Sequence, residues 1–227
     1  MVAIFVLIIF LSVLVVDIVV LNLQGKYHPA FEPLFNPLDM LIFDKSNYLI
    51  PSDMQFSKGH TWLRKNEDGT FDIGIDSFGT TVLGTMPILN YPVEGTEIKC
   101  GEMLLEAGRG DDKIKFLSPI SGIVKVVNRN LIESKISDAY STWNVKLISE
   151  NFSENEKMLL SGSKASTWMK KEFKKLKKFI DIHSVEIETA GATMYDGGSL
   201  SEDAVSSIVF NNAEDFEMKF LSYKSEI

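Results

Sequence analysis

The sequence predicts a mainly β domain, a sandwich or small barrel, preceded by one transmembrane helix and followed by a C-terminal helix and a small α/β tail. Three observations predict this organisation: an apolar stretch at residues 2–23, short apolar runs separated by Gly, Asn and Asp over residues 51–150, and helical periodicity over residues 163–180. The 227-residue chain has a formal net charge of -8, which argues against a nucleic-acid partner.

The apolar stretch from Val2 to Leu23 contains only three polar residues, Ser12, Asp17 and Asn22. A helix needs about 20 apolar residues to cross a bilayer core, so residues 1–24 are predicted to form a transmembrane anchor. The stretch lacks the basic start and the small-residue cleavage site of a signal peptide. Asp17 is costly in lipid, and two interpretations stay open: it reaches toward the interface, or it contacts a partner's transmembrane helix.

The charges that flank the anchor predict its orientation. Lys26 and His28 follow the apolar stretch, and no side-chain cation precedes it. The positive-inside tendency therefore predicts a single-pass protein of the cell membrane whose main domain is cytoplasmic. The single Cys100 suits a reducing compartment and would also suit a periplasmic protein.

Residues 25–50 are predicted to be a Pro-rich, apolar connector. Pro29, Pro33 and Pro37 recur every four residues, a density that prevents a regular helix. Aromatic and aliphatic residues are interleaved with them, so we expect the connector to lie on the membrane surface or on a neighbouring protein.

The middle of the chain has the short, regularly spaced apolar runs that are typical of strands in a sandwich or small barrel. The predicted strands are Phe71–Ile75, Gly84–Leu89, Met103–Glu106, Lys113–Leu117, Gly122–Val127 and Trp143–Ile148.

Several motifs in this region resemble those of the glycine cleavage system H protein family. They include FSKGHTWLR at residues 56–64, KCGE at 99–102, PISG at 119–122 and DAY at 138–140, in the order that the family has them. The likeness extends from Pro51 to Lys178. It implies a lipoyl-like β-sandwich hybrid fold for residues 51–180, closed by a helix.

In that family, lipoate is attached to one lysine at the tip of a hairpin. The family places this lysine ten residues after the glycine that matches Gly101 and eight residues before the proline that matches Pro119. Both counts lead to Asp111. A carboxylate cannot form the amide to lipoate, and Gly108 stands where the family has an acidic residue that the lipoyl ligase recognises.

Two functions follow from these departures at the predicted hairpin tip, Asp111, Asp112 and Lys113. The first is an adaptor or accessory subunit of a membrane-associated complex, with a protein partner and no cofactor. The second is a lipoyl carrier with lipoate on Lys113, in one-carbon, acyl or electron transfer related to glycine cleavage. No nucleophile stands beside a recognisable base, and one cysteine with three scattered histidines makes no metal-ligand set, so we expect neither an enzyme nor a metal site.

Residues 163–180 predict an amphipathic helix with a strongly basic face. Trp168, Met169, Phe173, Leu176 and Phe179 recur at helical spacing. Two interpretations stay open: the helix packs on the sandwich with its lysines in water, or it also meets an anionic membrane surface. The membrane-surface candidates are Lys170, Lys171, Lys174, Lys175, Lys177 and Lys178.

The resemblance does not cover residues 181–227, which are rich in acidic side chains. The pattern predicts a strand over His183–Glu188, a turn at residues 195–198, and short helices over Ser201–Phe210 and Asp215–Tyr223. This acidic α/β extension suits a solvated appendage or a surface for a basic partner.

Overall fold

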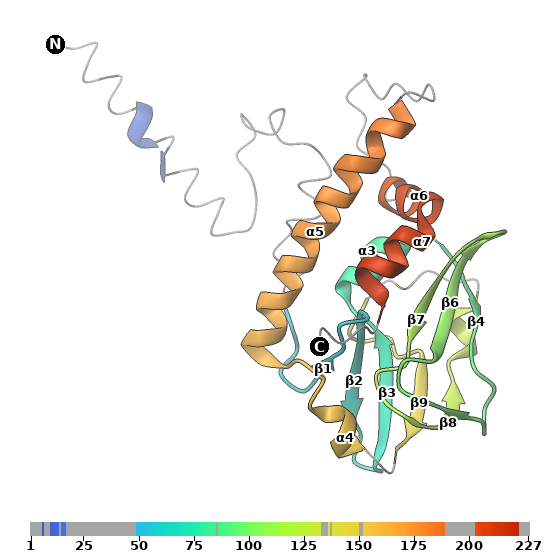
Figure 1. The fold of residues 1–227 in the computed structure, drawn as a ribbon. Coiled ribbons are helices and arrows are strands. Elements are labelled where there is room, and N and C mark those ends of the chain that lie inside the picture. The colour runs from blue at the N-terminus through green and yellow to red at the C-terminus, as the bar shows by residue number, and fades with distance from the viewer. Residues whose placement is uncertain are drawn as a thin grey trace. The chain divides into compact units, whose positions relative to one another are not determined.

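The computed structural model describes residues 49–222 except 85, 133–135, 137, 150–151 and 189–202, together with residues 6, 10–13 and 15–16. The chain separates into two compact units, residues 1–46 and 47–227, and the second carries the fold (Figure 1). Asp17, most of the predicted anchor, the connector up to residue 48 and the predicted turn at 195–198 lie outside the described residues. Among the residues that are described, no helix has the length and apolar character needed to cross a bilayer.

Two antiparallel sheets form the body of the second unit. One has six strands in the order β1-β2-β3-β9-β8-β5, and the other has three in the order β4-β6-β7. The strands are β1 Gln55–Phe56, β2 Thr61–Lys65, β3 Thr70–Ile75, β4 Ile88–Asn90, β5 Glu97–Ile98, β6 Met103–Arg109, β7 Asp112–Leu117, β8 Gly122–Val127 and β9 Val145–Ile148. This arrangement confirms the predicted sandwich.

Apolar side chains of these strands form a buried core cluster, together with Ile120 from the loop between β7 and β8. Alternation along the strands turns every second side chain inward, so the short apolar runs of the sequence supply this core. Its buried members are Leu63, Phe71, Ile73, Ile98, Leu104, Ile120, Val124, Val127, Val145 and Leu147.

A helix that the pattern did not predict follows β3. This helix, α3, spans Ser77–Leu83, and the Asp76 side chain caps it by accepting a hydrogen bond from the Gly79 amide at 2.9 Å. The predicted strand Gly84–Leu89 is therefore wrong over most of its length, and β4 begins only at Ile88. Asp76 favours helix here because it satisfies an amide at the start that has no partner within the helix.

The predicted basic helix is confirmed and is longer than predicted. After the short helix α4, Phe152–Glu156, the helix α5 spans Gly162–Glu188. The predicted strand over His183–Glu188 is wrong, because these residues form the last turns of α5. The His183 ring lies 4.4 Å from the Phe179 ring one turn earlier, a contact that helical spacing brings about.

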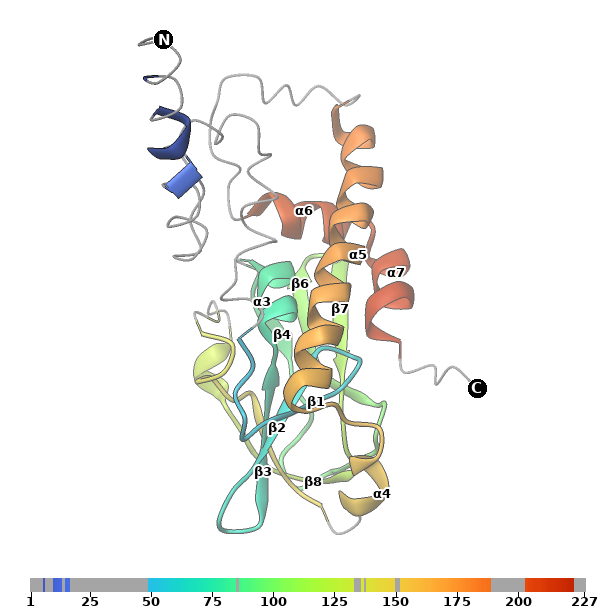
Figure 2. The same cartoon turned by 90° about the vertical axis from the view of Figure 1, so that its left-hand side faces the viewer.

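The described part of the C-terminal tail is almost entirely helical. It comprises α6 Asp203–Asn211, α7 Ala213–Phe216 and the π-helical turn η4 Glu217–Leu221, and a 3-10 turn, η3 Arg129–Leu131, lies between β8 and β9. Figure 2 shows α6 and α7 beside α5, and both tail helices contact the sandwich domain through α3 or β7. Because Val209 and Phe216 are fully buried there, this part of the tail belongs to the core and is no solvated appendage.

Candidate functional site

The hairpin between β6 and β7 carries the predicted carrier position. Arg109 pairs with Asp112 in the strand register, which leaves Gly110 and Asp111 as a two-residue turn. Gly110 has φ 62°, a conformation that suits glycine at the first central position of such a turn. The structure therefore places Asp111 at the exposed tip, where the residue count put it.

Gly108 occupies a backbone position that strongly favours glycine. Its φ is 146°, and a Cβ atom there would collide with the carbonyl oxygen of Asp112 and lie 2.9 Å from the Cα of Lys113. An acidic side chain three residues before the tip would strain this hairpin. Comparison with the family motif showed that the acidic residue is replaced by Gly108, but only the strand pairing shows why glycine is favoured there.

Lys113 lies on β7 rather than in the turn. It pairs with Gly108 across the hairpin, and its Nζ is 3.7 Å from Oε2 of Glu106. The Glu106 side chain is 11% exposed, and the same oxygen accepts a hydrogen bond from Asn90 at 2.5 Å. The amine of Lys113, with a side chain 39% exposed, is thus held along the strand by an ion pair.

The C-terminal tail reaches the same hairpin. The Lys115 amide on β7 donates a 2.6 Å hydrogen bond to Oε1 of Glu217. This bond occupies a backbone donor of a strand at the sheet's edge, where open donors invite pairing with another chain. A hollow of about 370 Å³ beside it is lined by residues that include Leu117, Met218 and Leu221. The sequence held no local signal for this contact, because 102 residues separate its partners.

His60, from the FSKGHTWLR motif, is fully buried and connects the segment just before β2 with α3 and α5. Its Nδ1 lies 3.0 Å from Oδ2 of Asp76, the residue that caps α3. Its ring stacks between Phe78 and Trp168 at centroid distances of 3.8 and 4.8 Å, and its Nε2 lies 4.0 Å from Oε2 of Glu172 on α5. The shielded ring contacts α3 and α5 at once, so this geometry gives it a structural role.

The DAY motif is also structural. Asp138 accepts a hydrogen bond from the Tyr140 amide, and this bond is the main cause of its lowered pKa. The Tyr140 hydroxyl lies 3.0 Å from Oγ of Ser77 on α3, and burial raises the pKa of Tyr140 to about 12. Within the described ranges, no group of three His, Cys, Asp or Glu side chains could hold a metal ion.

The basic helix turns its apolar side inward and its lysines outward. Met169, Phe173 and Leu176 are completely buried against the rest of the domain. Of the six membrane-surface candidates, five are exposed, and Lys177 is half-buried. The exposed ones are Lys170, Lys171, Lys174, Lys175 and Lys178.

These features define a lipoyl-like sandwich with a carrier-type hairpin and a closing helix. The glycine cleavage H-protein family model matches residues 54–172, more than half of the chain, and the chain therefore belongs to this family. The family resemblance inferred from the motifs is thus confirmed.

Individual H proteins are similar to about half of the chain. A probable glycine cleavage system H protein of Pyrococcus abyssi is 30% identical over 132 residues, which cover 57% of this chain and 98% of that protein. The glycine cleavage system H protein of Nitrosospira multiformis is 33% identical over 113 residues, or 48% of this chain and 88% of that protein. A crystal structure of a glycine cleavage system H protein from Mycobacterium marinum aligns with a TM-score of 0.43 at 22% identity and covers 52% of this chain and 98% of its own.

Proposed function

We propose that this protein is a membrane-anchored member of the H-protein family that carries no lipoate and acts as an adaptor or accessory subunit of a membrane-associated complex. The observation that carries the proposal is the carboxylate of Asp111 at the tip of the β6–β7 hairpin. Lipoate is attached through an amide, which requires an amine at the tip. The domain keeps the family's scaffold while its tip offers an acid.

The surroundings of the tip support the same conclusion. Gly108 lacks the acidic side chain by which a lipoyl ligase recognises the family's hairpin, and its backbone conformation disfavours any side chain there. The amine closest in the sequence, that of Lys113, lies on the strand with its Nζ 3.7 Å from Oε2 of Glu106. A ligase would have to break this ion pair and reach past the turn to modify it.

The second candidate function, a lipoyl carrier, is favoured by membership of a carrier family and by the partial exposure of Lys113. Intact mass separates the two functions, because attached lipoate adds about 188 Da. Protein purified from its native membranes should have the unmodified mass. A lipoate adduct that disappears in Lys113→Arg would overturn the adaptor proposal.

A lipoyl ligase assay in vitro provides the matching test. Asp111→Lys places an amine at the tip without touching Gly108, while the wild type keeps only Lys113 nearby. We expect no modification of the wild type at any ligase concentration that modifies an authentic H protein. Modification of Asp111→Lys alone would show that the hairpin is accessible to the enzyme and that only the missing amine protects it.

The membrane part of the proposal rests on residues 2–23 and on Lys26 and His28, which follow them. The protein should stay in the membrane fraction after alkaline carbonate extraction. A reporter that is active only in the periplasm, fused after Ile227, should give no signal if the main domain is cytoplasmic. A periplasmic signal would reverse the orientation.

The adaptor role predicts partners that depend on the hairpin. Proteins that co-purify from detergent-solubilised membranes should be compared between the wild type and a variant with Asp111→Ala and Asp112→Ala. Lys99→Ala, an exposed change away from the hairpin tip, is the matched control. A partner set that is the same for all three proteins would argue against the tip as the adaptor surface.

A further inference from the structure

The outer side of α5 carries a continuous row of cations, which we call the lysine face: Lys164, Lys171, Lys174, Lys175 and Lys178. All five side chains are exposed. At 3.6 residues per turn they lie within about 100° of the helix circumference, over about 21 Å of its length. Lys175 pairs with Glu172 at 2.7 Å, and the other four make no ion pair with any residue that the structure describes.

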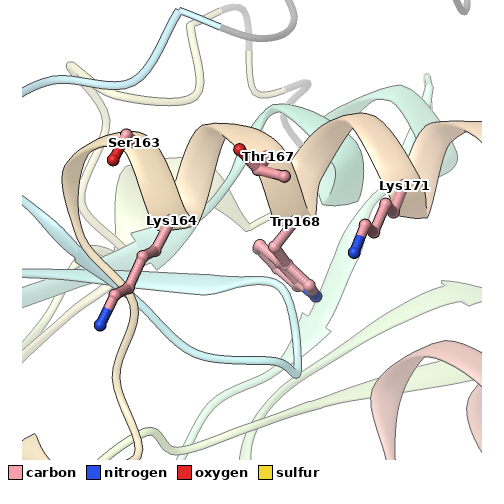
Figure 3. Close-up of a pocket in the computed structure, with 5 residues that line it drawn as sticks. All are labelled: Ser163, Lys164, Thr167, Trp168 and Lys171. Atoms are coloured by element: carbon pink, nitrogen blue, oxygen red, sulfur yellow. The ribbon is translucent and has the colours of Figure 1, made fainter.

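A hollow of about 340 Å³ opens at one end of the lysine face. It is lined by Ser163, Lys164, Thr167, Trp168 and Lys171. Figure 3 shows the Lys164 and Lys171 side chains on either side of the Trp168 ring, with all three projecting from the same side of α5. Two ammonium groups with two hydroxyls nearby offer the donors that a phosphate group requires.

The rest of α5 determines how this face can bind. Phe173 and Ile180 on the opposite side are at most 1% exposed, so the helix cannot turn an apolar side to lipid while the domain stays folded. Contact must therefore be electrostatic, with a small apolar contribution. Ile182 supplies one, because it is 61% exposed and lies five helical turns from Lys164, on the same line.

We infer that the lysine face docks on an anionic lipid surface, with a headgroup phosphate in the hollow between Lys164 and Lys171. Charge complementarity favours this partner, since the row of cations stands out on a chain of net charge -8. The choice of lipid over another polyanion rests on the proposed membrane anchor. A tether at residues 2–23 holds the domain near the bilayer, and lysine attraction acts only within a Debye length of about 10 Å at 0.1 M salt.

The experiment uses residues 47–227, so its outcome does not depend on the anchor. All described residues of the buried apolar core lie between Met54 and Leu221, and the chain divides into compact units at residue 46. This part therefore has a core of its own. It should float with vesicles that contain phosphatidylglycerol in phosphatidylcholine and not with phosphatidylcholine alone. Raising salt from about 0.1 M to about 1 M should release it.

The charge variants identify the face. Glutamine replacements at the four unpaired lysines of the face keep helix propensity and remove four charges. The matched control makes the same change at exposed lysines elsewhere: Lys65, Lys99, Lys115 and Lys125. Each lysine near an anionic surface contributes roughly a five-fold gain in partition, so the loss of four should make the face variant bind roughly 600-fold more weakly. The control should change less than about three-fold.

Three outcomes would overturn the inference. Equal binding to neutral vesicles would exclude an electrostatic contact, and equal loss in both variants would exclude the lysine face. Lysine acetylation footprinting supplies the third. If inorganic phosphate alone protects Lys164 and Lys171 as well as anionic vesicles do, the ligand is free phosphate and the lipid assignment is wrong. Protection by anionic vesicles only supports it. Release of the full-length protein from the membrane by alkaline carbonate would refute the anchor, and the vesicle test of residues 47–227 would still apply.

Discussion

Phe216→Ala tests whether the C-terminal tail is part of the folded domain. The Phe216 ring is fully buried. Its centroid lies 4.8 Å from that of Phe220, 5.8 Å from that of Phe179 on α5 and 6.3 Å from that of Phe78 on α3. The ring thus joins the tail to two helices that are distant in sequence, and its removal leaves a void among three aromatic side chains.

The expected loss of unfolding free energy follows from the contacts that the ring makes. Replacing a buried Phe by Ala costs about 3–5 kcal/mol in transfer and cavity terms. Three aromatic neighbours, two of them within 6 Å, favour the middle of that range or above, so we expect a loss of about 4 kcal/mol. At about 2–4 °C per kcal/mol for a domain of this size, the melting temperature should fall by about 8–16 °C.

Urea denaturation of residues 47–227, followed by tryptophan fluorescence, measures this loss. The matched control is Met218→Ala, two residues further along the tail, where the side chain is 64% exposed. The control should change the unfolding free energy by less than about 0.5 kcal/mol. If Phe216→Ala costs less than about 1 kcal/mol, or no more than the control, the tail does not pack as described and the reasoning fails.

Three further predictions concern the sandwich. Gly108→Ala should lower the unfolding free energy by about 3 kcal/mol, because φ is 146° and the new Cβ would collide with backbone atoms of β7. The control Gly110→Ala, where φ is 62° and the space is open, should lower it by about 1 kcal/mol. Similar losses in thermal melts would contradict the strand pairing. Trp62→Phe removes an indole N–H that donates to the carbonyls of Ile75 at 3.0 Å and Ala139 at 2.7 Å, so chemical denaturation should show a loss of about 1–3 kcal/mol. Hydrogen bonds lower the pKa of Asp68 to about 2, and the largest contribution comes from the Thr70 hydroxyl. The ionised carboxylate should therefore stabilise the fold fully above pH ~4, and this stabilisation should be lost as pH falls toward 2. Asp68→Asn should flatten the stability profile in that window, and an unchanged profile would contradict the assignment.

The local pattern of the sequence determined most strands and the basic helix, and the resemblance to the H-protein family implied the position of the hairpin tip. Strand periodicity and turn residues act over a few positions, so they can be recognised without knowing what the strands pack against. The count from Gly101 and from Pro119 reached Asp111 because no residue is inserted between these anchors, and the strand pairing places Asp111 at the turn. Helical spacing likewise predicted the buried side of α5.

Tertiary structure decided what depends on partners far apart in the chain. The apolar residues of the tail can be read from the sequence, but only their packing on α3, α5 and β7 shows that they belong to the core. The same holds for Glu217 at the Lys115 amide and for His60 between α3 and α5. Local pattern also predicted a strand at His183–Glu188, where alternation over six residues competed with the continuing helix. Burial against a distant segment stabilises one conformation by a free energy that does not depend on short-range propensity. This free energy determined which of the locally possible conformations formed.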